Sequence, residues 1–392
     1  MSLPLHDPEF YLGDVQAVYR RLRAEAPVYW SEAAGLWALT KYADIQRVSK
    51  DPATFCSSRG VIVNDPLRLA GDLPTPPSII HMDPPAHNRY RKLVSGAFTP
   101  RAVAMLEPRI RELVRETLAA APANGSFDFV EHVAVPVPLL VIAEMLGVPP
   151  GDRDTFRRWS DAVIAGADAD AASAMMGEIA ELFAYFQEML GRRRAEPRAD
   201  LISALATGVV DGDRLSDEEI LMFCMTLLVA GNETTRNLVA GGTRTLLEHP
   251  DELARLRRDP ALLPGAIEEM LRWVSPIRCF IRTATRDTEI RGTAIPEGAV
   301  VALFYASGNR DEEVFGPTAG EFRIDRPLEP AHLAFGFGEH FCLGASLARL
   351  EARLMFEGIL GRWSRLEIAG PVDVLPSTLM NGLVRLPVRA WA

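Results

Sequence analysis

The chain has 392 residues, 48% of them hydrophobic, and a formal net charge of −10 at pH 7. This composition supports a large hydrophobic core, and the acidic balance argues against nucleic acid as a partner, because nucleic-acid binding usually needs a basic surface. No apolar run reaches the ~20 residues of a membrane span, and the N-terminal MSLPLHDPEF lacks the regions of a signal peptide.

The cysteines and the connecting segments indicate one unit in a reducing compartment. The four cysteines, Cys56, Cys224, Cys279 and Cys342, lack the spacing of disulfide pairs or zinc sites. There is no internal repeat, low-complexity tract or interdomain linker. We therefore expect a single domain over residues 1–392 of a soluble, cytoplasmic protein without a membrane anchor.

The N-terminal half reads as a hairpin followed by helices. Residues 28–40, VYWSEAAGLWALT, alternate as two short strands around a turn. In DPPAHNRYRKLV, His87 and Arg91 stand i,i+4 after Pro84–Pro85, so both should project from one face of a helix. Helical periodicity continues over residues 102–120, 152–165 and 171–190.

One long helix is expected from Ser216 to about residue 249. Ser216 and Glu219 have the spacing of a capping box, and the segment from Ile220 to Ala230 is largely apolar. The sequence GNETT then interrupts it, and a glycine with two threonines in a helix interior favours a local bulge that opens a polar notch. The alternative is plain helix packing, with Gly231 as a close contact and the threonines bonded back to their own helix.

Two helices and a strand region follow. In LLPGAIEEMLRWV, residues 262–274, Glu269 and Arg272 lie i,i+3 on one helix face, a pair that is common on surface helices. Arg282 falls on an extended segment after Ser275–Pro276, and residues 288–304 read as strands around a Pro296–Gly298 turn. Leucines with helical spacing after residue 342 predict the last long helix.

The segment FGFGEHFCLG, residues 335–344, sets Cys342 between a glycine-rich turn and a helix N-terminus. Backbone N–H groups that converge there lower a thiol pKa, and the thiolate is the form that binds metal. Gly336 and Gly338 can adopt positive φ and bring the backbone close to a flat ligand, while Gly344 removes bulk. A buried core thiol is the alternative for a lone cysteine.

This segment resembles the haem-binding loop of cytochrome P450 enzymes, FGxGxHxCxG, at every fixed position, and AGNETT is similar to the family's oxygen-binding groove. The resemblance runs from about residue 7 to the end of the chain. It implies a mainly α fold with a smaller β-rich region, a triangular prism with a long central helix over the haem. It also implies a haem-thiolate monooxygenase of the soluble bacterial class, in which the thiolate favours O–O cleavage.

Roles for single residues follow from the same resemblance. Thr234 would hydrogen-bond dioxygen and Glu233 would relay protons, while Glu269, Arg272 and Arg326 of the FRIDR segment (residues 322–326) would form a structural lock. Cys342 would bind the iron of haem b. The residues implied to hold the cofactor are His87, Arg91, Gly231, Arg282, Phe335, Gly336, His340, Cys342 and Gly344, of which His87, Arg91, Arg282 and His340 would bind the two propionates.

By resemblance the substrate faces residues 58–82, about 160–180, 222–230, 277–281 and 377–381. Their side chains are mainly aliphatic, which favours an apolar ligand. Arg278 is the exception and could meet a substrate carboxylate or turn to the surface. Segments such as GNETTRN are similar to the corresponding segments of bacterial family members that oxidise sterol side chains, terpenoids or branched lipids. The substrate-contact candidates are Ile80, Val229, Ala230, Ile277, Arg278, Leu379 and Met380.

The implied reaction inserts one oxygen atom of O2 into a C–H bond, with electrons from NAD(P)H through a ferredoxin reductase and a ferredoxin. Arg349 and Arg353 on one helix face, with Lys92 and Arg101, could receive the acidic ferredoxin, or could be an ordinary solvated surface. A peroxide-using or non-redox haem-thiolate enzyme and a haem-based gas sensor are the alternatives. The Glu233–Thr234 pair favours oxygen activation over the peroxide-using or non-redox enzyme, and a sensor would need a second domain to receive its signal, which is not expected here.

Overall fold

The structure, a computed structural model, describes residues 2–70, 78–165, 169–210 and 212–392. Helices dominate it. Their bounds are α1 Val15–Glu25, α2 Tyr42–Ser49, α3 Pro66–Ala70, α4 Ala86–Val94, α5 Pro100–Ala120, α6 Pro136–Leu146, α7 Arg153–Ala165, α8 Ala169–Ala195, α9 Leu201–Thr207, α10 Asp217–Glu248, α11 Pro250–Arg258, α12 Leu263–Val274, α13 Tyr305–Gly308, α14 Glu312–Phe315 and α15 Ala345–Arg362.

The strands are short: β1 Val28–Ser31, β2 Leu36–Leu39, β3 Phe55–Cys56, β4 Gly125–Asp128, β5 Cys279–Ala284, β6 Thr288–Ile290, β7 Thr293–Ile295, β8 Val300–Phe304, β9 Arg365–Ile368, β10 Asp373–Val374, β11 Leu383–Arg385 and β12 Pro387–Trp391. The largest sheet has the order β1-β2-β8-β5-β3, and a smaller one has the order β4-β12-β9. The hairpin at 28–40 and the strands within 288–304 are confirmed.

The central helix α10 forms for local reasons. Ser216 accepts a hydrogen bond from the Glu219 N–H at 3.1 Å, and the Glu219 carboxylate accepts from the Ser216 N–H at 2.8 Å, which confirms the predicted capping box. The helix ends at Glu248, because Pro250 disfavours a helical conformation at His249. A helix that is apolar on most sides must be enclosed by others.

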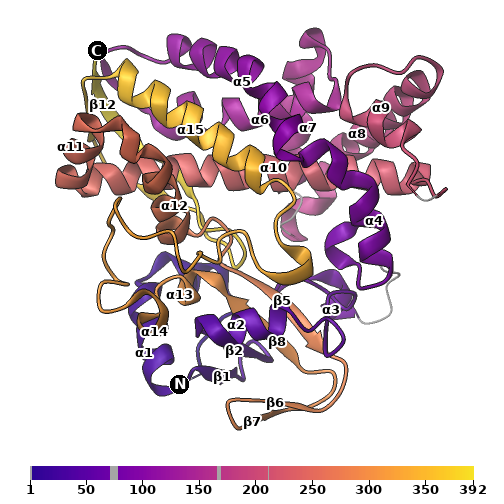
Figure 1. Cartoon of the computed structure of the whole chain (residues 1–392), viewed down its shortest axis with the longest axis vertical. Helices are drawn as coiled ribbons and strands as arrows, with labels where there is room; N and C mark the ends of the chain where they lie inside the picture. The colour runs from indigo at the N-terminus through magenta and orange to yellow at the C-terminus, as the bar shows by residue number, and fades with distance from the viewer. Residues whose placement is uncertain (1, 71–77, 166–168, 211) are drawn as a thin grey trace.

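In Figure 1, α10 crosses the middle of the molecule, with α15 and α5 beyond it on the side of the C-terminus and the largest sheet on the side of the N-terminus. α15 packs against α5, and α10 packs against α6, α12 and α15. The main hydrophobic core lies between these helices. Two smaller apolar clusters cover the sheet that contains β2, β5 and β8.

The sheet register positions the segment that follows α12. β8 pairs in parallel with β2 and antiparallel with β5, and this pairing sets Arg282 opposite Val301. α12 stops at Val274 because Ser275 takes a left-handed conformation with φ 46°, and Pro276 comes next. The chain therefore leaves the helix and enters strand β5 at Cys279, within the largest sheet beside β8 (Figure 1).

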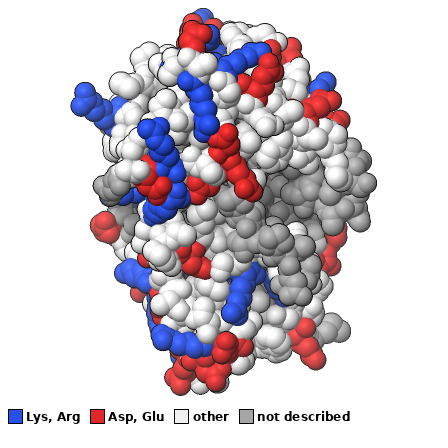
Figure 2. All heavy atoms as spheres, turned by 90° about the vertical axis from the view of Figure 1, so that its right-hand side faces the viewer, with Lys and Arg blue, Asp and Glu red and all other residues white. Residues whose placement is uncertain are grey.

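The surface carries charges of both signs. On the face shown in Figure 2, Lys and Arg side chains are interspersed with Asp and Glu side chains in the described part of the chain. Among the described residues, no helix combines the length and the hydropathy that crossing a membrane requires.

One buried carboxyl in the core has a consequence for stability. Glu351 of α15 is 1% exposed, its Oε2 atom lacks a hydrogen-bond partner in the described structure, and burial raises its pKa well above the usual 4.5. The folded protein therefore retains a proton that the unfolded chain releases above its ordinary pKa. This retention costs stability that grows as the pH rises through the ordinary pKa and toward the folded value.

We expect Glu351→Gln to raise the unfolding temperature at about pH 8 by more than at about pH 5, because the amide keeps the shape without a proton to lose. Calorimetric scans at the two pH values measure the difference. The exposed Glu116 supplies the control, and Glu116→Gln should leave the pH dependence unchanged. An equal gain at both pH values would show that the ionisation of Glu351 is not the cause.

Candidate active site

The loop before α15 has the backbone that its glycines predict. Gly336 and Gly338 have φ values of 69° and 70°, which confirms the expected left-handed conformations. The Cys342 N–H donates to the Phe335 carbonyl at 2.8 Å and closes the turn three residues before α15 begins. A Cβ atom on Gly338 would overlap the carbonyl oxygen of Ser49. The close approach at Gly338 is therefore to the end of α2, whereas the sequence suggested a flat ligand.

Cys342 has a mixed electrostatic environment. The surrounding protein atoms desolvate the sulfur and raise its pKa. The Gly344 N–H and the guanidinium groups of Arg91 and Arg349 act in the opposite direction. The net direction is upward, so the expectation that the helix N-terminus lowers the thiol pKa in the chain alone is wrong, because desolvation exceeds the local dipoles. An ion that binds the thiolate would reverse this balance.

Four basic side chains converge beside this loop from three separate segments. His87 and Arg91 come from α4, Arg282 from β5, and His340 from the loop itself. The rings of His87 and His340 lie 4.3 Å apart between centroids, and Arg91 Nη2 donates to the Phe341 carbonyl at 2.7 Å. Arg282 is 6% exposed, and its Nη1 donates to the carbonyl of the neighbouring Ile281 at 2.7 Å.

The basic groups of this cluster disfavour protonation of its two histidines. Burial, followed in order of effect by the charges of Arg282, His87 and Arg91, lowers the pKa of His340 to about 2. Within the described ranges neither Arg91 nor Arg282 forms an ion pair with a carboxylate, and the buried His87 Nε2 has no partner. Buried cations of this kind need anionic partners. The cluster therefore fits the carboxylates of a haem beside a cysteine ligand.

The predicted bulge in α10 is absent from the described structure. The helix is regular α from Asp217 to Glu248, and Thr234 Oγ1 donates to the Ala230 carbonyl at 2.7 Å. A Cβ atom on Gly231 would clash with the side chain of Ile142. The glycine thus permits close packing of α10 on α6, and the alternative interpretation of this motif describes the geometry. Ala230 is exposed and Thr234 partly exposed, so this face remains accessible.

Glu233 lies in a different environment from its neighbour. Its side chain is 4% exposed, and its Oε1 atom accepts a hydrogen bond from Arg236 Nη1 at 2.8 Å. Thr234 instead bonds back to its own helix at Ala230. The sequence did not indicate Arg236, although its i,i+3 spacing from Glu233 is a sufficient signal for such a pair.

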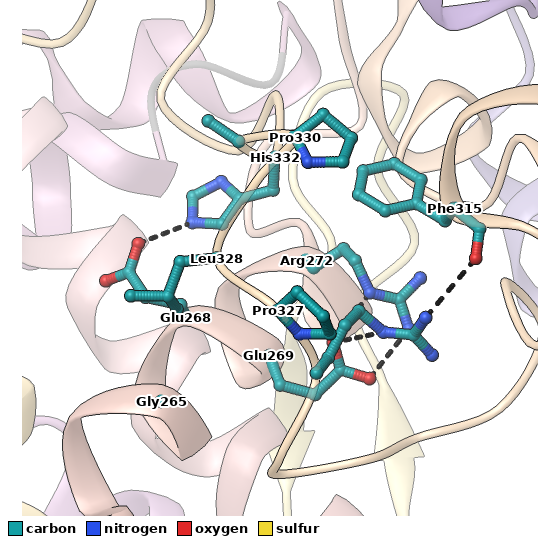
Figure 3. A pocket seen from close by; sticks show the side chains of 11 residues that line it. Gly265, Glu268, Glu269, Arg272, Phe315, Pro327, Leu328, Pro330 and His332 are labelled. Carbon is teal, nitrogen blue, oxygen red and sulfur yellow. Dashed lines mark hydrogen bonds and ion pairs between the residues drawn. The ribbon is translucent and has the colours of Figure 1, made fainter.

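Glu269 and Arg272 form a buried pair that joins α12 to the segment before the cysteine loop (Figure 3). Arg272 Nε and Nη2 each lie 2.7 Å from a Glu269 carboxylate oxygen, and Arg326 Nε donates to the same carboxylate at 3.0 Å. Arg272 also donates to three backbone carbonyls, those of Asn309, Ala319 and Glu321. The structure thus brings together the three residues of the expected lock.

Two of the candidate substrate segments, 277–281 and 377–381, lie side by side. Ile277 pairs with Met380 in an isolated bridge, and the Arg278 N–H donates to the Leu379 carbonyl at 2.7 Å. Ile80, Val229, Ile277, Leu379 and Met380 are all partly exposed. Residues 71–77 and 166–168, and the side chains of residues 161 and 163–175, lie outside what the structure describes, so those parts of the segments 58–82 and 160–180 are not placed.

Arg278 lies in a buried cluster. Its side chain is 2% exposed, its Nε donates to the Met380 carbonyl at 2.9 Å, and its guanidinium carbon lies 5.0 Å from the ring centroid of Tyr11. These contacts tie the turn at residues 377–381 to β5 and to the N-terminal segment. The surface orientation considered from the sequence is therefore wrong, because the aromatic and carbonyl partners hold the guanidinium inside.

The suggested basic patch is largely neutralised by glutamates of the same chain. Arg349 binds Glu268 through two hydrogen bonds of 2.7 and 2.8 Å, and Arg353 binds Glu107 and Glu357 at 2.8 and 2.9 Å. Glu268 and Glu107 come from distant parts of the sequence, which could not indicate them, whereas Glu357 stands i,i+4 from Arg353. Two of the four proposed ferredoxin contacts are therefore already engaged in ion pairs.

Comparisons with known proteins agree with this geometry. The family model described as Cytochrome P450 matches residues 164–390. A steroid C26-monooxygenase of Mycolicibacterium smegmatis is 40% identical over 96% of this chain and 92% of the relative's length. A vitamin D(3) 25-hydroxylase of Pseudonocardia autotrophica is 41% identical over 94% of this chain and 92% of its own.

Solved structures share the whole fold. Cytochrome P450 CYP109Q5 from Chondromyces apiculatus superposes with a TM-score of 0.89 at 39% identity and covers 99% of this chain and 98% of its own. CYP109E1 from Bacillus megaterium, solved in complex with testosterone, has a TM-score of 0.87 at 35% identity, with coverage of 96% and 99%. The expected mainly α fold is confirmed, and this chain belongs to the cytochrome P450 family as a haem-thiolate monooxygenase acting on apolar substrates.

Proposed function

We propose that the chain binds haem b with Cys342 as the iron ligand and hydroxylates a sterol-like or other extended apolar molecule. The observation that carries the proposal is the cluster of His87, Arg91, Arg282 and His340, four basic groups without carboxylate partners in the described chain, beside the cysteine loop. Haem b has two propionates that would satisfy this cluster.

When bound, haem supplies the activation of O2 and the insertion of one oxygen atom into a C–H bond. The protein holds the cofactor through the Cys342 sulfur and through charge-assisted hydrogen bonds from Arg91 and Arg282. Gly336 and Gly344 would leave room for the ring, and the Phe335 ring packs beside that of Phe341. Glu269, Arg272 and Arg326 act at a distance, since they fix the segment that leads into the loop.

Proton supply falls to two side chains of α10. Oxygen activation consumes two protons in a site that excludes bulk water, so each proton must pass through fixed groups. We propose that Thr234 Oγ1 turns from the Ala230 carbonyl to donate a hydrogen bond into the site, and that Glu233 passes protons inward. Glu233 is held by Arg236 at 2.8 Å, so its release from Arg236 is part of the relay.

The substrate proposal rests on the lining and on the relatives. Ile80, Val229, Ala230, Leu379 and Met380 offer apolar surface around the accessible face of α10, and such a lining favours an apolar ligand. The relatives named for steroid and vitamin D(3) oxidation, and the testosterone complex, extend this to polycyclic or sterol-like molecules. Arg278 contributes by holding the turn at Met380, and no substrate carboxylate is required.

Electrons come from NAD(P)H through a ferredoxin reductase and a ferredoxin in this proposal. The test combines purified protein with such a pair, testosterone or vitamin D3, and oxygen, in parallel with hydrogen peroxide alone. We expect product and NADPH consumption in the first reaction. Turnover with peroxide alone would favour a peroxide-using enzyme. Gas binding without any product from either reaction would favour a sensor.

The Thr234→Ala variant should keep its haem but divert electrons from product to hydrogen peroxide, because the hydroxyl that directs protons is gone. The measurement is product and peroxide formed per NADPH consumed. Thr235→Ala, the buried neighbour on the same helix, is the matched control and should stay coupled. An unchanged ratio of product to NADPH in Thr234→Ala would refute the role of this hydroxyl.

A further inference from the structure

Glu268, the residue before the buried pair of α12, faces a different set of partners. Arg349 Nε donates to Glu268 Oε1 at 2.7 Å, and Arg349 Nη2 donates to Glu268 Oε2 at 2.8 Å. His332 Nε2 lies 3.2 Å from Glu268 Oε2, as Figure 3 shows across the small pocket between α12 and the segment before the loop. The bidentate arrangement fixes both the distance and the orientation of the guanidinium.

The charges in this group are well defined. The Ala334 N–H donates to His332 Nδ1 at 3.1 Å, so the proton of a neutral His332 lies on Nε2, the atom that faces Glu268. Burial raises the pKa of Glu268, but the hydrogen bonds from Arg349 and His332 outweigh burial and hold the pKa at about 2. Glu268 is therefore an anion at neutral pH, and Arg349 is its paired cation.

Arg349 connects this pair to the cysteine loop. Its guanidinium carbon lies 4.6 Å from the centroid of the Phe335 ring, and the Phe335 carbonyl accepts the Cys342 N–H at 2.8 Å. The positive charge of Arg349 also acts on the Cys342 sulfur and favours its thiolate. The sulfur thus experiences a cation whose field is partly cancelled by the carboxylate behind it, because opposite charges at short distance act outward as a weaker dipole.

We propose that Glu268 is a positioning residue that limits the positive charge felt by the Cys342 thiolate and thereby sets how strongly the sulfur donates electrons to the metal. The proposal rests on Cys342 being the haem ligand, as proposed above. A sulfur that faces an unpaired Arg349 would donate less and favour the reduced state of the metal. A sulfur that faces an unpaired Glu268 would donate more and disfavour that state.

The two halves of the pair therefore make predictions of opposite sign. We expect Glu268→Gln to shift the haem reduction potential to more positive values and Arg349→Gln to shift it to more negative values. Each change should alter the one-electron reduction equilibrium by about threefold to tenfold, where tenfold corresponds to about 59 mV. Dye-coupled reductive titration measures the potential without reference to activity.

Three further variants sharpen the experiment. Glu268→Asp retains the charge and should stay close to the parent potential, and the double variant Glu268→Gln/Arg349→Gln should return toward it. Arg353→Gln, one turn further along α15 and paired with Glu107 and Glu357, removes a cation that has no contact with Phe335 and should cause no shift.

Shifts of the same sign in the two single variants, no shift in either, or loss of haem from both would overturn the proposal, since each indicates a purely structural role. Arg349 keeps 40% of its side chain exposed, so Arg349→Gln is expected to fold. If Glu268→Gln does not fold, Arg349→Gln alone tests the sign of the shift in reduction potential. Failure of the proposed function is separately visible. It would appear in the parent protein as a carbon monoxide spectrum without the red-shifted thiolate band.

Discussion

We expect Cys342→Ala to lose monooxygenase activity completely and to lose the red-shifted Soret band that reduced, carbon monoxide-treated thiolate proteins display. Alanine offers no atom that can bind the metal, and no other cysteine of the chain lies in the loop. The thiolate is what favours O–O bond cleavage in this family. The measurements are the reduced carbon monoxide difference spectrum and product formation with the ferredoxin pair.

The fold should tolerate the Cys342 substitution. Its side chain is partly exposed in the chain alone, and the hydrogen bond that closes the turn comes from its backbone N–H, which alanine retains. Far-ultraviolet circular dichroism should therefore match that of the parent. A loss of activity with an unchanged thiolate band would show that another group binds the metal.

Cys56→Ala is the matched control for this prediction. Cys56 is a buried cysteine on β3 and lies outside the loop that precedes α15. Its substitution should leave the carbon monoxide spectrum and turnover close to those of the parent, with at most a modest loss of stability from the smaller side chain. If the thiolate band disappeared in Cys56→Ala and persisted in Cys342→Ala, Cys56 and not Cys342 would be the ligand.

Features that depend on a few neighbouring residues could be predicted from the sequence. The capping box at Ser216, the hairpin within 28–40 and the positive φ of Gly336 and Gly338 all follow from local chemistry, and all are confirmed. Spacing i,i+3 likewise indicated that Glu269 and Arg272 face the same way. Such local rules need no knowledge of the surrounding chain.

Features that depend on contacts between distant segments could not be predicted. The expected bulge near Gly231 assumed that the glycine weakens α10, whereas Ile142 of α6 fills the space beside it and the helix stays regular. Arg349 and Arg353 resembled a free basic face, but Glu268, which binds Arg349, and Glu107, which binds Arg353, lie 81 and 246 residues away in sequence. The thiol pKa of Cys342 was expected to fall, and the desolvation that raises it comes from packing.

The second large effect concerns Arg272, and we expect Arg272→Ala to destabilise the protein by about 3–5 kcal/mol, because it leaves the buried Glu269 carboxylate without its main partner. Both side chains are at most 2% exposed, so water cannot replace the lost bonds. Three backbone carbonyls, those of Asn309, Ala319 and Glu321, lose a donor at the same time. Urea unfolding followed by circular dichroism measures the change.

Arg272→Lys should recover only a small part of this loss, although it restores the charge. An ammonium group cannot bind both oxygens of Glu269 in one plane while it reaches three carbonyls in other directions, and the fork of a guanidinium can. The exposed Arg323 supplies the control, since its carboxylate contact with Asp325 is 3.6 Å and Arg323→Ala should change stability by at most about 0.5 kcal/mol. If Arg272→Lys were as stable as the parent, charge alone would explain the pair.

A domain has about 5–15 kcal/mol of stability in total, so the loss expected for Arg272→Ala would remove much of it. The segment that leads to the cysteine loop would then be the first part of the site to lose its fixed position.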